Sequence, residues 1–170
     1  MFWRLVTACR QNDLDGVKFL LSKYKNIIHT KEQNQDHEII IPLHICLHEG
    51  FIEIAKLLVS KGVNVNERDS GGITAMHIIA STSGIKKIDF LLSNNASINI
   101  RDNGGVTPII DAFTVNNQGI LYQLGKEYQR ILIHNCEVFK YLGKDNIYFI
   151  MRKIIEPEIK DSSIIRMVYG

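Results

Sequence analysis

Short apolar runs recur along the chain at a constant interval and are separated by polar stretches. Residues 54–59 read Ile-Ala-Lys-Leu-Leu-Val, and residues 87–92, which lie 33 positions later, read Lys-Ile-Asp-Phe-Leu-Leu. Thr74 and Thr107 keep the same interval, and each stands two residues after a Gly-Gly pair. A fixed period of this length is typical of a solenoid, in which units too small to bury their own apolar faces stack on their neighbours. The pattern therefore predicts a row of repeated units around one continuous core.

Two segments have the same turn and helix signature. Residues 69–80 read Asp-Ser-Gly-Gly-Ile-Thr-Ala-Met-His-Ile-Ile-Ala, and residues 102–112 read Asp-Asn-Gly-Gly-Val-Thr-Pro-Ile-Ile-Asp-Ala. This pattern resembles the ankyrin repeat, whose unit is a turn, a T-P-L-H-x-A segment, a short helix, and a second helix ending in leucines before G-A-D-V-N. The resemblance is close over residues 36–117. It implies an all-α, ankyrin-repeat solenoid of stacked helix-turn-helix units with hairpin turns.

The units at the two ends depart from the repeat. The first lacks the T-P-L-H turn, as expected of a cap that has no preceding neighbour. In the fourth, the second helix end is displaced by about nine residues, which indicates an insertion between Asn116 and Tyr128. Beyond residue 135, apolar residues still recur near helical spacing, so this part forms either a fifth, capping unit or a separate partner-binding helix. We expect a single ankyrin-repeat domain made of an N-terminal capping repeat (1–35), repeat 2 (36–68), repeat 3 (69–101), repeat 4 with the insertion (102–135) and a divergent helical C-terminal cap (136–170).

Several motif residues are expected to have structural roles. The Gly-Gly pairs precede turns that need positive φ, which explains them better than a phosphate loop does. Thr74 and Thr107 are placed to cap the helices that follow them. The resemblance implies that His44 and His77 hydrogen-bond the backbone near the helix start and between neighbouring units.

Repeat 2 lacks two features of this turn. Ile41 stands at the threonine position, and Glu38 and Ile39 stand where the other repeats have Gly-Gly. Its turn must therefore differ in conformation or carry strain, since glycine is the residue that adopts positive φ without steric cost. The departure is either sequence drift or an apolar contact point.

Composition narrows the classes of function. The chain has 170 residues, 45% of them hydrophobic and 22% charged, which is ordinary for a packed soluble domain. A net charge of +2 is too small to hold a polyanion by its phosphates, so nucleic acid is not an expected partner. Three cysteines without a CxxC pair argue against a disulfide framework and a thiolate metal cage. We expect a cytoplasmic protein with no membrane span, bound metal or cofactor.

No catalytic constellation is recognisable in the sequence. His44 and His48 are four residues apart and could face one another on a helix, but no third metal ligand accompanies them. An enzyme with a Cys136 nucleophile and the nearby His134 remains the alternative from another class. We therefore expect a protein that is not an enzyme.

The residues left after the structural positions are removed form the expected binding surface. The resemblance implies that ankyrin stacks bind partner proteins through a concave groove made of hairpin tips and the exposed faces of the first helices. Residues 36–119 hold six basic and nine acidic side chains, so the middle of the chain is acidic. The expected partner-binding residues are His37, Glu38, His48, Glu49, Arg68, Ser70, Gly71, Ser81, Thr82, Arg101, Asn103, Gly104, Thr114 and Val115.

The kind of partner is suggested by the resemblance and by the composition. Short ankyrin proteins without an effector domain are similar either to host-directed proteins of viruses and intracellular bacteria, including relatives of the NF-κB inhibitor IκB, or to small cellular adaptors. The many isoleucine, asparagine and lysine residues suggest an AT-rich genome. We expect a pathogen-encoded modulator that acts in the host cytoplasm or nucleus on a Rel-family (NF-κB) or another host signalling protein, with a cellular adaptor as the alternative.

Overall fold

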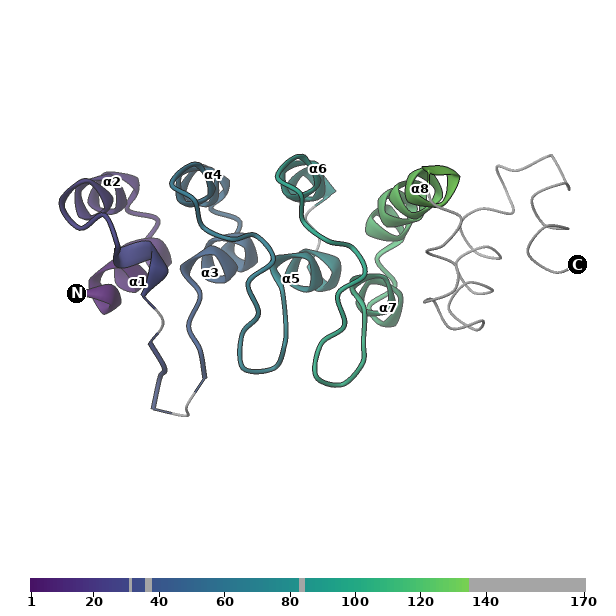
Figure 1. Cartoon of the computed structure of the whole chain (residues 1–170), viewed down its shortest axis with the longest axis horizontal. Coiled ribbons are helices and arrows are strands. Elements are labelled where there is room, and N and C mark those ends of the chain that lie inside the picture. The colour runs from purple at the N-terminus through teal and green to yellow at the C-terminus, as the bar shows by residue number, and fades with distance from the viewer. Residues whose placement is uncertain (31, 36–37, 83–84, 135–170) are drawn as a thin grey trace, which may run out of the picture. The chain divides into compact units, whose positions relative to one another are not determined.

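Helices make up most of the regular structure (Figure 1). The computed structural model describes residues 1–30, 32–35, 38–82 and 85–134. Within this part of the chain no strand forms beyond an isolated antiparallel bridge between Gln33 and Ile39. The elements are α1 (Phe2–Arg10), α2 (Leu14–Lys23), the 3-10 helix η1 (Ile27–His29), α3 (Pro42–Glu49), α4 (Ile52–Ser60), α5 (Ala75–Ser81), α6 (Ile85–Ser93), α7 (Pro108–Thr114) and α8 (Gln118–His134).

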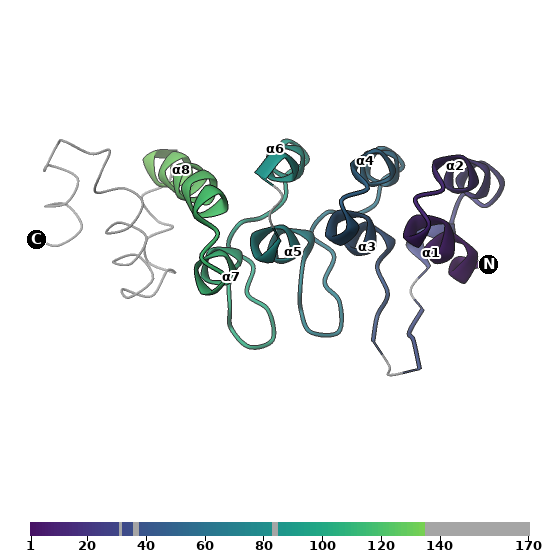
Figure 2. The ribbon, with the colours of Figure 1, turned by 180° about the vertical axis from the view of Figure 1, so that it is seen from behind.

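The chain divides into two compact units, residues 1–120 and 121–170. In the first unit, α1, α3, α5 and α7 lie in one row, and α2, α4 and α6 lie in a second row (Figures 1 and 2). Consecutive members of the first row pack against one another, and α2 packs against α4. The loops that lead into α3, α5 and α7 all project on the side away from the second row (Figure 1). This layering confirms the predicted all-α stack of helical pairs.

The 33-residue period of the sequence places equivalent residues in the core of successive repeats. In the second helices, Leu58 of α4 and Leu91 of α6 stand 33 residues apart, and both are fully buried. Short connections turn the chain between the helices of a pair, through Asn12 at φ 54° in the first repeat and Gly50 at φ 88° in the second. Asparagine and glycine are the residues that adopt this left-handed conformation most readily. The shared conformation fixes the register between these two repeats.

The hairpins before α5 and α7 share one conformation. In both, the second glycine of the pair has positive φ, 78° at Gly72 and 81° at Gly105. The aspartate that opens each loop accepts hydrogen bonds from loop amides, since Asp69 Oδ1 binds the Ile73 amide and Asp102 Oδ1 binds the Val106 amide. Asp69 Oδ1 also accepts the Gly71 amide at 2.9 Å, which is the i to i+2 contact of an Asx turn. The predicted role of the Gly-Gly pairs as turn residues is confirmed.

The loop before α3 has a different conformation. Gln33 and Ile39 form an antiparallel bridge, the Asn34 amide donates to the Glu38 carbonyl at 3.0 Å, and the Ile40 amide donates to the Glu32 carbonyl at 3.1 Å. This ladder replaces the tight glycine turn. Of the two outcomes predicted for repeat 2, the change of conformation is therefore the observed one.

Repeat 4 absorbs its extra residues in a longer second helix. α8 has 17 residues, whereas α4 and α6 each have nine. Most of the segment predicted as an insertion after Asn116 thus belongs to α8. In the second unit, Leu121, Leu124 and Tyr128 form a buried stripe at helical spacing. The C-terminal cap predicted for residues 136–170 lies outside the described residues.

No helix in the described part of the chain is both long enough and apolar enough to cross a lipid bilayer.

Candidate protein-binding surface

The hairpin tips are joined to one another by hydrogen bonds. The Ile39 amide of the first hairpin donates to Ser70 Oγ of the second at 2.7 Å. The Asn103 amide of the third hairpin donates to the Gly71 carbonyl, and its Nδ2 donates to the Ser70 carbonyl, both at 2.9 Å. Each tip is thereby fixed relative to the next. We call the exposed tip residues the hairpin row: Glu38, Ser70, Gly71, Asn103 and Gly104.

Gly72 allows this close approach between hairpins. A Cβ atom on Gly72 would lie 2.8 Å from the backbone nitrogen of Asn103, closer than real Cβ contacts occur. A Cβ on Gly105, at the equivalent place in the next hairpin, would meet nothing within 4 Å. The glycine at position 72 therefore has a second role besides its positive φ.

Arg68 and Arg101 bind within the same surface. Arg68 Nη2 donates to Asn103 Oδ1 of the next hairpin at 3.2 Å, and Arg101 Nη1 donates to the Gly105 carbonyl at 2.8 Å. The aspartates that follow them, Asp69 and Asp102, accept hydrogen bonds from loop amides. Both arginines thus donate to neutral oxygens, which leave the guanidinium charges uncompensated by these bonds.

The other predicted residues lie at the ends of the first helices. His48 and Glu49 end α3, Ser81 ends α5, and Thr114 ends α7; all four are exposed, as is Val115 just beyond α7. Three of these side chains bond within their own helix: His48 Nδ1 and Glu49 Oε1 are 3.1 Å apart, and Ser81 Oγ donates to the Ile78 carbonyl. These positions recur at the 33-residue period. His37, the remaining predicted contact, lies outside the described residues.

Thr82 differs from the other helix-end residues because its backbone has a structural bond. It is only partly exposed, and its carbonyl accepts a hydrogen bond from Asn117 Nδ2 at 2.8 Å. The same Asn117 side chain accepts the Ile120 amide at 3.3 Å through its Oδ1, which caps the start of α8. Asn117 therefore ties the end of α5 to the start of α8. The sequence signal for it was an asparagine one residue before a helix.

Two further inter-repeat links were missed in the sequence. Asn66 Nδ2 donates to the Asn95 carbonyl at 3.0 Å, and its Oδ1 accepts the Ser97 amide at 2.7 Å. Lys87 Nζ donates to the Leu47 carbonyl of the preceding repeat at 2.7 Å. A polar residue in an otherwise apolar repeat position was the available signal for Lys87, since Ile54 stands one period earlier.

His77 has the role that the resemblance implied. The Thr74 amide donates to His77 Nδ1 at 3.2 Å, and the Thr74 hydroxyl lies 2.8 Å from the same nitrogen. Because Nδ1 accepts, the ring proton lies on Nε2, which donates to the Val106 carbonyl of the next hairpin at 3.2 Å. The prediction of bonds both at the helix start and between units is confirmed for His77.

His44 occupies the same position in repeat 2 without these bonds. Ile41 replaces the threonine and offers no side-chain bond at the helix start. The His44 ring is 8% exposed, and its Nε2 lies near the Glu67 backbone without a hydrogen bond of normal geometry. Burial lowers the pKa of His44 to about 4, and this outweighs the opposing effect of the Asp69 and Glu67 carboxylates. The inter-unit bond expected of His44 is therefore wrong.

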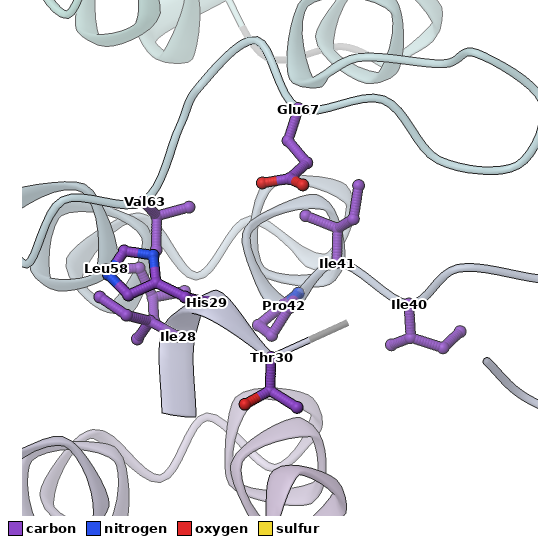
Figure 3. Close-up of a pocket in the computed structure, with 9 residues that line it drawn as sticks. All are labelled: Ile28, His29, Thr30, Ile40, Ile41, Pro42, Leu58, Val63 and Glu67. Carbon is purple, nitrogen blue, oxygen red and sulfur yellow. The ribbon is translucent and has the colours of Figure 1, made fainter. Parts of the chain in front are cut away.

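A small pocket borders this irregular turn (Figure 3). Its volume is about 30 Å³, enough for a water molecule and far below the size of a small-molecule site. Glu67 points its carboxylate toward it beside Ile41 (Figure 3). The pocket therefore has room for solvent and gives no sign of a cofactor site.

Metal-binding groups do not gather in the described part of the chain. No cluster of three or more histidine, cysteine, aspartate and glutamate side chains there has the arrangement of a metal site. Cys136 of the alternative catalytic site lies outside the described residues, and His134 is the last residue of α8.

Comparison with known proteins agrees with the geometry. A family model described as ankyrin repeats (3 copies) matches residues 5–102 and again residues 43–135, so the matches span most of the chain. No curated protein matches the sequence significantly. Proteins of this family are generally non-catalytic modules that bind other proteins. With its stacked helical pairs, period of 33 residues and hairpin turns, the chain belongs to the ankyrin-repeat family.

Proposed function

We propose that the chain binds a partner protein through a groove formed by the hairpin row and the ends of the first helices, with no catalytic activity of its own. The observation that carries this proposal is the set of hydrogen bonds that joins Ile39 to Ser70 and Ser70 to Asn103 across three hairpins. A surface whose elements are already fixed loses less conformational entropy when it binds. The exposed tips therefore form a preorganised surface rather than three independent loops.

The charges favour a partner that presents carboxylates to the hairpins. Arg68 and Arg101 both donate to neutral acceptors, so their positive charges stay available to an incoming carboxylate. A planar guanidinium forms paired hydrogen bonds with a carboxylate, which gives orientation as well as affinity. The helix ends are more mixed, with Glu49 acidic and Ser81 and Thr114 neutral.

A narrower version of the proposal takes the partner to be a host signalling protein such as a Rel-family dimer, with the chain as a pathogen-encoded, IκB-like inhibitor in the host cytoplasm or nucleus. Its support is the sequence composition, together with free, buried thiols at Cys9 and Cys46 that suit a reducing compartment. A direct binding measurement with purified Rel-family dimers tests it. Absence of a complex at micromolar concentration would leave the cellular adaptor as the better version.

Quantitative capture from cell extract tests the groove itself. We expect a partner that is recovered by the wild-type chain and lost with Ser81→Arg or Arg101→Asp. The matched control is Glu53→Lys on the exposed side of α4, where the ion pair with Lys56 is 2.9 Å long. A partner whose recovery falls with Glu53→Lys and not with the groove variants would refute the groove assignment.

A further inference from the structure

The outer side of the first repeat contains a hollow of about 500 Å³ between α1 and α2. Trp3, Arg4, Ala8, Gly16 and Phe19 are among the residues that line it. The two aromatic side chains at this hollow are well exposed, Trp3 at 41% and Phe19 at 61%. Aromatic side chains exposed together on one surface are typical of an interaction site. We call this surface the N-terminal face.

The register shows what the equivalent surface does in the other repeats. Asn12 and Gly50, both with positive φ, are 38 residues apart and align the first two repeats. On this alignment Ala8 corresponds to Cys46, which is fully buried and whose pKa is raised by the neighbouring Cys9 of the preceding repeat and by burial. Gly16 corresponds to Ile54 and, one period later, to Lys87, which donates to the Leu47 carbonyl of the preceding repeat. The N-terminal face is therefore the side of a repeat that receives its preceding neighbour.

Phe19 supports the same conclusion. Its counterparts are Leu57 in α4 and Phe90 in α6, both large and apolar and both partly buried. The first repeat keeps the apolar side chain at this position although no preceding repeat in this structure covers it. An apolar residue that is kept where a neighbour is expected indicates a surface that becomes buried in an assembly.

The N-terminal face is complementary to itself. It has a well-exposed ring, Phe19, and a hollow lined by the small residue Ala8, where repeat 2 has the larger Cys46. The Asp13 side chain covers Gly16 within this hollow. A positive and a negative side chain, Arg4 and Asp13, also line the hollow. In a two-fold symmetric dimer each contact occurs twice, because residue i of one chain meets residue j of the other and the reverse.

We propose that the N-terminal face binds the same face of a second copy of this chain. Phe19 of each chain then enters the hollow of the other, and Arg4 of each chain lies against Asp13 of the other. This contact uses helices α1 and α2 and leaves the hairpin row exposed. Self-association and partner binding therefore use different surfaces, and an experiment can refute one proposal without refuting the other.

Sedimentation velocity of the full chain between about 1 and about 200 µM tests this dimer. Trp3 is the only tryptophan in the sequence, so a blue shift of the fluorescence with concentration reports burial of the same face. We expect Phe19→Lys to weaken self-association at least about 30-fold, as for an interface hot spot. Ser60→Lys, which adds the same charge at the exposed end of α4, is the matched control and is expected to leave it unchanged.

A charge exchange distinguishes the two-fold arrangement from other contacts. Arg4→Glu and Asp13→Lys should each weaken self-association, and an equimolar mixture of the two should restore it, since both charge pairs become attractive across the mixed dimer. Asp13 also caps α2 by accepting the Gly16 amide at 2.8 Å, so far-ultraviolet circular dichroism must verify that this variant folds. If it does not, Arg4→Glu alone decides the role of charge.

A chain that remains monomeric over this range, or a Phe19→Lys variant that associates like the wild type, would overturn the proposal. The hollow would then be left for an apolar helix of another protein.

Discussion

At the start of its first helix, repeat 3 has Thr74 and His77, whereas repeat 2 has Ile41 and His44 at the same two positions. In repeat 3, His77 bonds the Thr74 amide and the Val106 carbonyl of the next hairpin. In repeat 2, the buried Nε2 of His44 has no good hydrogen bond. Both helices nevertheless form at the same place in their repeats, over Pro42–Glu49 and Ala75–Ser81.

The difference separates two contributions to the fold. Apolar periodicity places the helical pairs, because repeat 2 forms without the threonine or the glycine turn. The hydrogen bonds at the turn determine the free energy needed to bury the histidine. A buried polar group without a hydrogen bond costs about 1–3 kcal/mol. Substitutions that exchange features between repeats 2 and 3 therefore test each contribution separately.

The largest effect is expected from the matched core leucines. Leu58→Ala and Leu91→Ala should each lower the free energy of unfolding by about 2–5 kcal/mol, because both leucines are fully buried. Leu58 lines the small open pocket, so solvent can enter the space it leaves, and its cost should lie toward the lower end. Urea denaturation followed by circular dichroism measures both. Values below about 1 kcal/mol for both would contradict the repeat register.

The two hairpin glycines should differ in cost. Gly105→Ala adds only the strain of a side chain at positive φ, about 1 kcal/mol. Gly72→Ala adds the same strain and a contact with the Asn103 backbone, so we expect about 2–3 kcal/mol. Thermal and urea unfolding of the two variants provide the comparison. Equal costs would show that the contact between hairpins contributes little.

Acid should destabilise the chain through His44. Its folded pKa of about 4 lies below its ordinary value of 6.5, so the unfolded state binds more protons between these pH values. Its stabilising contribution is complete above about pH 6.5 and is lost as the pH falls toward 4, by about 2 kcal/mol between pH 7 and pH 5. Urea titrations at both pH values should show a smaller loss for His44→Leu than for the wild type. His29→Gln, at an exposed histidine, should behave like the wild type.

The smallest effect is expected when repeat 3 is made to resemble repeat 2. Thr74→Val keeps the shape of the side chain and removes the hydroxyl beside His77 Nδ1, which should cost about 1 kcal/mol. Nitrogen chemical shifts of the His77 ring should still report the proton on Nε2, because the Thr74 amide continues to donate to Nδ1. A loss of that tautomer would show that the hydroxyl, and not the amide, fixes the ring.

The sequence was sufficient for the stack and for the hairpins because both depend on local periodicity. The spacing of Thr74 and Thr107 predicted the repeats, and the Gly-Gly pairs predicted the positive φ at Gly72 and Gly105. The extent of α8 was less accessible, since an insertion in a repeat pattern does not reveal whether the added residues extend a helix or form a loop.

Contacts between repeats could not be read from the sequence. The bonds of Asn66 and Lys87 depend on how far one repeat lies from the next, which the period does not specify. The missing hydrogen bond of His44 Nε2 is also a three-dimensional property, because it depends on which groups the fold brings next to the buried ring. The predicted groove residues fall on exposed hairpin tips and helix ends, and their contribution to binding stays a prediction.

The bonds between hairpins connect only immediate neighbours, and this has a consequence for how the structure opens. Local unfolding that starts at one end is therefore expected to break the bonds of one hairpin before those of the next. The Ile39 amide, held by a single serine hydroxyl, should exchange its hydrogen for deuterium sooner than the Asn103 amide, which bonds a backbone carbonyl next to a second bond from its own side chain. The sequence of amide exchange along the tips would thus reveal the end from which the chain begins to open.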